Sequence, residues 1–218
     1  MYKYKYLLFD MDGTITDSYD AVTRSFIYAL EYYGIKVKEG ERLDFILGPP
    51  LRQSFENHYG FTPEKAVEAT EKYRERYQKY FLKEHKIFDG VENLLSDLNK
   101  CGFKNILATS KPEVSARKIL EHFNLDKYFY YISGASLDSS RDTKEKVLEH
   151  IFDELKIPDK SKSIMIGDRK YDMMGAKHMN IDALGVTYGY GTRQELEAYN
   201  PVYIADNCKQ IYDFLTKK

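Results

Sequence analysis

Short apolar runs and segments of helical periodicity follow one another along this chain. A short apolar run that ends in turn residues is typical of a buried strand, whereas apolar residues three and four positions apart predict a helix. The predicted strands are residues 6–9, 104–109, 128–133, 162–166, 183–187 and 202–205. The predicted helices are residues 18–33, a short helix that reaches residue 59, a long one from residue 63, then 89–101, 113–123, 143–155, 171–179 and one at the C-terminal end.

The first part of this pattern differs from the rest. Residues 16–85 carry only helical signals, interrupted by the rigid turn Gly48-Pro49-Pro50. From residue 86 onward strands and helices alternate, which indicates a parallel sheet with helices on both faces. The sequence therefore predicts an α/β fold with a doubly wound parallel sheet. Residues 1–15 and 86–218 would form the core, and residues 16–85 an inserted all-helical domain.

Composition narrows the class of protein. The 218 residues are enough for a full core, and the net charge of −1 gives no bulk attraction to nucleic acid or to an anionic membrane. No apolar stretch approaches the roughly 18 residues that a membrane span needs. The chain shows no signal-peptide pattern, and its two cysteines are too few for a disulfide framework. We expect a cytoplasmic protein without nucleic-acid or membrane partners, and leave monomer or homodimer open.

Polar residues stand at or shortly after the ends of four predicted strands. They are Asp10 and Asp12, then Thr109 and Ser110, then Lys144 after a polar loop, then Asp168 and Asp172. Each group alone has an ordinary structural explanation as a turn, a cap or a surface charge. In a doubly wound sheet, however, ligands bind beyond the carboxyl ends of the strands, where the strand order reverses. The four groups together therefore indicate an active site at that edge.

The paired carboxylates fit phosphoryl transfer through a covalent intermediate. Phosphate monoesters hydrolyse very slowly, so a route that splits the reaction through an aspartyl-phosphate is favourable. Asp10 suits the nucleophile. Asp12, two residues further on, suits the acid/base that protonates the leaving oxygen and then activates water.

A divalent cation is expected beside these carboxylates, because phosphate and carboxylate repel each other. Oxygen ligands without a histidine or cysteine cluster point to Mg²⁺. We expect Asp10 and Asp168 to bind the ion directly, together with the backbone carbonyl of Asp12. Asp172, one helical turn past Asp168, is expected to act from outside the ligand set.

Three more residues are expected to hold the phosphate. The Thr109 hydroxyl and the Ser110 N–H would bind phosphoryl oxygens, and Lys144 would offset the charge on nucleophile and phosphate. Lys146 is the alternative to Lys144. We prefer Lys144 because it directly follows the polar loop, whereas Lys146 should point away from the site.

These motifs resemble those of the haloacid dehalogenase (HAD) superfamily phosphatases. Asp10-Met11-Asp12-Gly13-Thr14 matches the first motif of that family, Leu107-Ala108-Thr109-Ser110 the second, Lys144 the third, and Gly167-Asp168 with Asp172 the fourth. The likeness covers nearly the whole chain and implies a Rossmann-like core. The helical insertion resembles the cap of the family's first subclass. Residues 45–51, Lys111-Pro112 and residues 188–191 look like the phosphoglycolate phosphatase branch, which includes 5′-nucleotidases.

The resemblance implies a Mg²⁺-dependent phosphatase whose partner is a small phosphorylated metabolite, with a cap that opens and closes. Gly48 and Arg52 in the cap are expected to contact the substrate. Phosphoglycolate, a nucleoside monophosphate, pyrophosphate and a sugar phosphate all stay open as substrates. The alternative functions are a 5′-nucleotidase or pyrophosphatase of the same fold, a sugar phosphomutase, and a non-catalytic phospho-sensing module. A dehalogenase is disfavoured, because Asp12 supplies an acid/base that ester hydrolysis needs.

Overall fold

The fold was analysed in a computed structural model that describes residues 2–38, 40–138 and 140–217. The strands are β1 (Tyr6–Phe9), β2 (Thr16–Asp17), β3 (Lys86–Ile87), β4 (Lys104–Pro112), β5 (Tyr131–Ala135), β6 (Ser163–Gly167), β7 (Asp182–Val186) and β8 (Tyr203–Ala205). The α-helices are α1 (Tyr19–Tyr32), α2 (Leu51–Tyr59), α3 (Pro63–Glu84), α4 (Val91–Lys100), α5 (Glu113–His122), α6 (Lys144–Leu155), α7 (Lys170–Met179), α8 (Arg193–Glu197) and α9 (Cys208–Thr216). Single turns of 3-10 helix lie at Asp44–Ile46, Asp126–Tyr128 and Lys160–Lys162.

Six strands form one parallel sheet in the order β5-β4-β1-β6-β7-β8. This confirms the predicted α/β fold with a doubly wound sheet. From β1 the chain adds β4 and β5 on one side, and then returns to add β6, β7 and β8 on the other. The strand order therefore reverses at β1, and ligand sites in such sheets lie at the carboxyl ends of the strands at this reversal.

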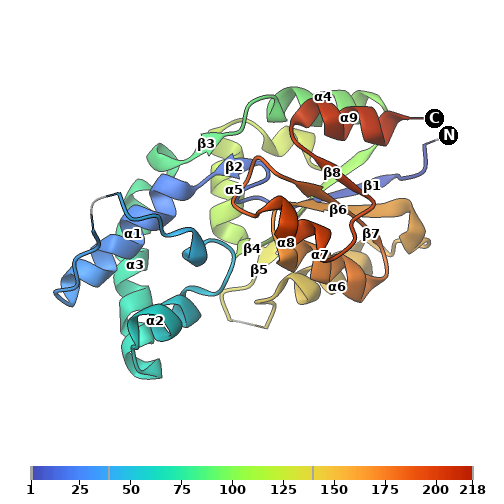
Figure 1. Cartoon of the computed structure of the whole chain (residues 1–218). Coiled ribbons are helices and arrows are strands. Elements are labelled where there is room, and N and C mark those ends of the chain that lie inside the picture. Colours follow the sequence, from blue (N-terminus) through green and yellow to red (C-terminus); the bar gives the residue numbers. More distant parts are fainter. Residues whose placement is uncertain (1, 39, 139, 218) are drawn as a thin grey trace. The chain divides into compact units, whose positions relative to one another are not determined.

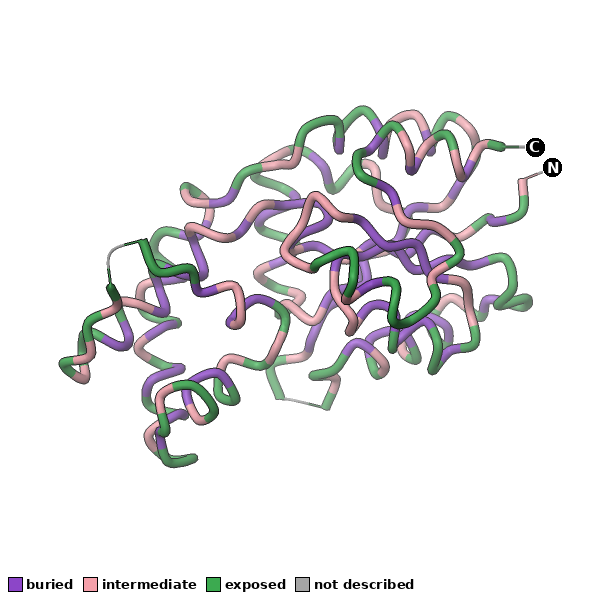
Figure 2. The backbone as a smooth tube through the Cα atoms, in the orientation of Figure 1, coloured by how far each residue is buried: buried purple, intermediate pink, exposed green. Residues whose placement is uncertain are grey.

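The core of the sheet lies between two layers of helices. Figure 1 shows α4 and α9 above the sheet and α6, α7 and α8 below it. Leu8 of β1 is in register with Ile106 of β4 and Met165 of β6, and all three are buried in one cluster with residues of α6 and α7. Alternate residues of a strand face opposite sides. Both sides are covered here, so most residues of the central strands β1, β4 and β6 are buried (Figure 2).

Residues Ser18–Lys86 form a second compact unit, separate from the unit made of Met1–Asp17 and Ile87–Lys218. In this second unit α3 packs along α1 and α2. Its core is aromatic: the buried ring of Phe26 stacks on Phe55 with centroids 4.3 Å apart, and Phe45 and Tyr59 lie against it. Among the described residues of this unit, all regular secondary structure is helical except Lys86, the first residue of β3.

Three details of the prediction are wrong. Residues 16–17 and 86–87 form β2 and β3, which pair as a two-stranded sheet at the chain crossings between the units. Two residues are too few to show a strand period, so the sequence could not indicate them. The strand predicted at 128–133 begins only at Tyr131, because residues 126–128 form a 3-10 turn. The short helix α8 was not predicted.

Truncation of the stacked ring in the second unit should test its core. Phe26→Ala removes a side chain that is 0% exposed, and should lower the free energy of unfolding by about 3–5 kcal/mol. Tyr32→Ala on the same helix is the matched control, because Tyr32 is 63% exposed. Chemical denaturation followed by circular dichroism measures both. A loss for Phe26→Ala no larger than that of the control would contradict the described packing.

Candidate active site

A tight loop after β1 fixes the first two acids. The backbone N–H of Asp10 donates to the carbonyl of Ile166 in β6, which continues the sheet by one residue. The carbonyl of Met11 then accepts three backbone N–H groups, from Thr14, Ile15 and Thr16, at 2.8 to 3.2 Å. The chain thus reverses its direction within six residues. In an extended strand the side chains point alternately to opposite faces, but this turn allows Asp10 and Asp12 to face the same site.

Lys144 connects the acids of two different segments. Its Nζ lies 2.8 Å from an oxygen of Asp10 and 2.8 Å from an oxygen of Asp172, and it donates to the carbonyl of Ala108 at 2.7 Å. The lysine is 3% exposed and is the first residue of α6, directly after its cap Thr143. Lys146, the alternative, is exposed and pairs with Asp142. The structure therefore brings Lys144, and not Lys146, to the acids.

Asp168 is completely buried beside the loop after β1. Its carboxylate accepts the backbone N–H of Tyr190 at 2.7 Å and the Thr14 hydroxyl at 3.4 Å. Gly13, with a φ of +84°, makes this approach possible, because a Cβ there would overlap the Asp168 carboxylate. Asp172 is also fully buried, and one of its oxygens accepts the N–H of Arg169 at 3.1 Å.

The burial of these acids makes their negative charge costly. Burial raises the pKa of Asp168 well above its usual range, and the neighbouring carboxylates of Asp172 and Asp10 raise it further. Burial and Asp10 likewise raise the pKa of Asp172 to about 6, against the lowering effect of Lys144. Burial alone would lower the pKa of Lys144, but Asp10 and Asp172 reverse that and raise it. The cluster therefore contains one ammonium group, that of Lys144, and three carboxylates, so it lacks positive charge to balance them.

A divalent cation fits this cluster. One carboxylate oxygen from each of Asp10, Asp168 and Asp172 lies within 4.8 Å of the others. The ligands are oxygens only, which suits a hard ion such as Mg²⁺, and a cation would relieve the repulsion that raises the pKa of Asp168. The oxygens of Asp172 also face Lys144 and the Arg169 N–H, and its expected place outside the ligand set stays a prediction.

An irregularity in β4 shapes the second motif. Pairing with β5 is regular up to Ala108 opposite Ser133, and resumes only at Pro112 opposite Ala135. Residues 109–111 therefore face a single residue of β5, a local distortion of the kind that re-aims side chains next to active sites. Thr109 is buried, and its hydroxyl accepts the N–H of Lys111 at 3.2 Å.

Lys111 lies at the site although no role was predicted for it from the sequence. Its Nζ lies 2.7 and 3.0 Å from the two carboxylate oxygens of Asp12, and its side chain is 6% exposed. In the sequence, Lys111 was noted only because Lys111-Pro112 resembles the phosphoglycolate phosphatase branch. Its spacing of two from Thr109 could have suggested that both residues serve the same side of a strand.

Two expected substrate contacts lie in the helical unit. Gly48 has a φ of +107° and belongs to the turn before α2, and Arg52 is an exposed residue in the first turn of that helix. Their contact with substrate stays a prediction.

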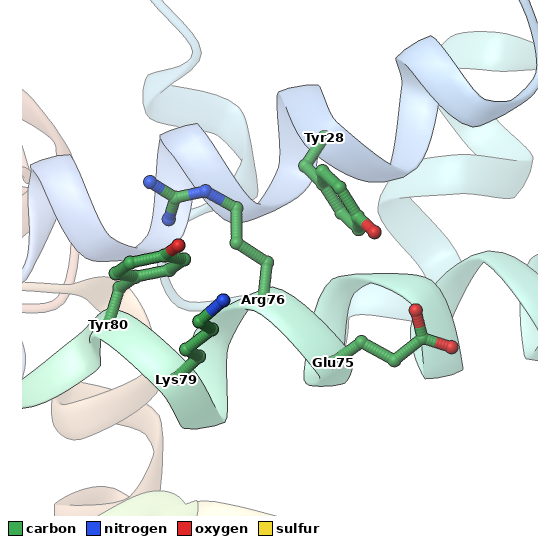
Figure 3. A pocket seen from close by; sticks show the side chains of 5 residues that line it. All are labelled: Tyr28, Glu75, Arg76, Lys79 and Tyr80. Atoms are coloured by element: carbon green, nitrogen blue, oxygen red, sulfur yellow. The ribbon is translucent and has the colours of Figure 1, made fainter.

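A hollow on the helical unit has different chemistry from the strand ends. It measures about 340 Å³ and is lined by Tyr28, Glu75, Arg76, Lys79 and Tyr80 of α1 and α3 (Figure 3). Arg76 is bound there by two contacts to Glu84, at 2.6 and 2.8 Å. This hollow offers no group of acids for a metal, and we do not assign the active site to it.

Comparison with known proteins identifies the family to which this fold and this group of acids belong. The pattern of the haloacid dehalogenase-like hydrolases matches residues 7–186, and the chain belongs to that family. A 5′-nucleotidase of Pseudomonas aeruginosa is 42% identical over 205 residues, which are 94% of this chain and 92% of the relative. The crystal structure of a predicted phosphatase from Clostridium acetobutylicum is 42% identical, with a TM-score of 0.92 over 97% of both chains.

A third relative is named for a different activity. The Tyrosine-protein kinase PtkA of Mycobacterium tuberculosis is 40% identical over 185 residues, which are 85% of this chain but 62% of that protein. The family match and the two phosphatase-named relatives support a phosphatase-like hydrolase of the HAD family, and the names of the relatives differ in activity. Among the described residues, no helix has the length and apolar character to cross a membrane.

Removal of the central ammonium should expose its part in compensating the buried acids. Lys144→Met leaves Asp10 and Asp172 without their ion-pair partner, so the free energy of unfolding without Mg²⁺ should fall by about 3–5 kcal/mol. Lys146→Met, the matched control, should change it by less than about 0.5 kcal/mol, because Lys146 is a surface residue. Urea denaturation in the presence of a chelator measures both. Equal effects of the two substitutions would show that Lys144 does not compensate the acids.

Proposed function

We propose that this protein is a Mg²⁺-dependent phosphatase that hydrolyses a small phosphate monoester through an aspartyl-phosphate on Asp10. The observation that carries the proposal is the contact of Lys144 with both Asp10 and Asp172, beside the buried Asp168. The Lys144 ammonium group, 2.8 Å from Asp10, offsets the negative charge that the nucleophile and a bound phosphate bring together. Family membership and phosphatase-named relatives support the same reaction class.

The proposed reaction has two steps. In the first, a carboxylate oxygen of Asp10 bonds to phosphorus, the bond to the leaving oxygen breaks, and the Asp12 carboxyl gives that oxygen its proton. In the second, Asp12 takes a proton from a water molecule that attacks phosphorus, which releases inorganic phosphate and restores Asp10. The sum is one ester and one water converted to one alcohol and one phosphate.

The other residues supply charge and position. Asp10, Asp168 and the backbone carbonyl of Asp12 would hold Mg²⁺, with Asp172 beside them. When bound, the ion offsets the charge that phosphate and carboxylates bring together. The Thr109 hydroxyl and the Ser110 N–H, at the distorted end of β4, would hold phosphoryl oxygens.

The substrate class rests on similarity. The 5′-nucleotidase of P. aeruginosa, at 42% identity, makes nucleoside monophosphates the first class to test. Phosphoglycolate, pyrophosphate and sugar phosphates follow, and Gly48 and Arg52 are the cap residues proposed to select among them. A small soluble metabolite in the cytoplasm is the partner we propose.

Phosphate release is the direct test of the reaction. Purified protein with Mg²⁺ should release inorganic phosphate from at least one compound of a panel that contains these four classes. A chelator should abolish the release, and Asp10→Asn should reduce it by at least about 10³-fold, because the nucleophile is removed. Mass spectrometry of the rapidly quenched wild type should find a phosphoryl group on Asp10.

Two results would reject the proposal. One is a wild-type protein that releases no phosphate from any compound of the panel, and the other is an Asp10→Asn variant that keeps full activity. Conversion of a sugar phosphate without net release would instead assign a phosphomutase. A lasting phosphoryl group on Asp10 without turnover would assign a sensing module, and transfer to tyrosine would assign a kinase like the mycobacterial relative.

A further inference from the structure

Lys111 forms a second ion pair at the site, apart from that of Lys144. Its ammonium group contacts both carboxylate oxygens of Asp12, at 2.7 and 3.0 Å. The Thr16 hydroxyl approaches one of these oxygens as well, at 3.5 Å. The two lysines therefore divide the acids between them, with Lys144 on Asp10 and Asp172, and Lys111 on Asp12.

The two contacts define the orientation of the Asp12 carboxylate. An ammonium that reaches both oxygens fixes the plane of the group, whereas a single contact would leave it free to turn about its last torsion. Lys111 is itself held at the backbone, because its N–H donates to the Thr109 hydroxyl within the distorted end of β4. Lys111 of β4 and Thr16 of β2 thus both contact the Asp12 carboxylate.

Orientation matters for the task proposed for Asp12. Proton transfer requires the carboxyl oxygen within hydrogen-bond distance of the leaving oxygen and of the attacking water. A displacement of about 1 Å can cost about 10²-fold in rate. Asp12 is 28% exposed on its side chain, so tight packing does not immobilise it. The fixed position has to come from its hydrogen-bond partners.

We propose that Lys111 is a positioning residue for Asp12. It holds the carboxylate at the place from which Asp12 exchanges protons with the leaving oxygen and with water. This inference rests on the proposed phosphatase function, and it assigns Lys111 to the proton transfer and not to binding of the phosphate.

A series of aryl phosphates with leaving groups of graded acidity tests this assignment. A poor leaving group such as phenolate needs the proton from Asp12, whereas 4-nitrophenolate leaves almost without it. In Lys111→Met, kcat/KM for phenyl phosphate should fall by about 10- to 100-fold, and that for 4-nitrophenyl phosphate by less than about 3-fold. Lys111→Arg, which keeps the charge and the donors, should recover part of the loss.

Two further variants sharpen the result. Asp12→Asn should show the same dependence on the leaving group, and the double variant Asp12→Asn/Lys111→Met should be no slower than Asp12→Asn alone. Lys100→Met is the matched control, since Lys100 is an exposed lysine paired with Asp97 at 2.8 Å, and its kinetics should equal those of the wild type. Thermal denaturation checks that all variants are folded.

The outcomes separate this inference from the function on which it rests. A uniform loss across the series in Lys111→Met would mean that Lys111 binds the phosphate, and no loss would mean that it has no part in the reaction. Additive losses in the double variant would also overturn the positioning role. If the wild type hydrolyses no member of the series or of the metabolite panel, the phosphatase function itself fails.

Discussion

The contact of one buried ammonium group with one buried and one largely buried carboxylate is the constraint on which the rest of this core depends. Lys144 lies between Asp10 and Asp172, with Asp168 close by, and all four side chains are largely or completely withdrawn from water. Charges in such a place are tolerated only when they are paired and hydrogen-bonded. The loop after β1, the first turn of α6 and the first turn of α7 are therefore bound to one another through charge.

Much of this arrangement follows from the sequence, for a physical reason. Asp10 and Thr109 stand directly after apolar runs, and Asp168 stands one glycine beyond such a run. In a parallel sheet the carboxyl ends of the strands meet at one edge. Residue type and position along the strand therefore predict which polar groups share a site before any coordinate is known. The α/β class was predictable in the same way, because alternating strands and helices leave few other ways to bury both faces of a sheet.

Other features have no local signal. The pairing of Lys111 with Asp12 joins residues 99 positions apart, and it depends on a distortion of β4 that the apolar pattern of residues 104–108 does not reveal. The strands β2 and β3 are too short for periodicity, and the 3-10 turn at Asp126–Tyr128 displaces the start of β5 although tyrosine and phenylalanine favour a strand there. Contacts between residues far apart in the sequence determine these details, so the local pattern of apolar and polar residues does not predict them.

The sequence separations have a consequence for synthesis. Asp10 pairs with Lys144 and Asp12 with Lys111, so the acids near the N-terminus leave the ribosome long before their partners. Domains generally form as units during synthesis, and the helical unit of residues 18–86, with its own aromatic core, is complete by then. Asp10 meanwhile lacks its ion-pair partner, because Lys144 has not yet been added to the chain. A nascent or prematurely ended product can thus contain a folded helical unit while it lacks the charged cluster, so catalytic competence is acquired only after α7 has been made.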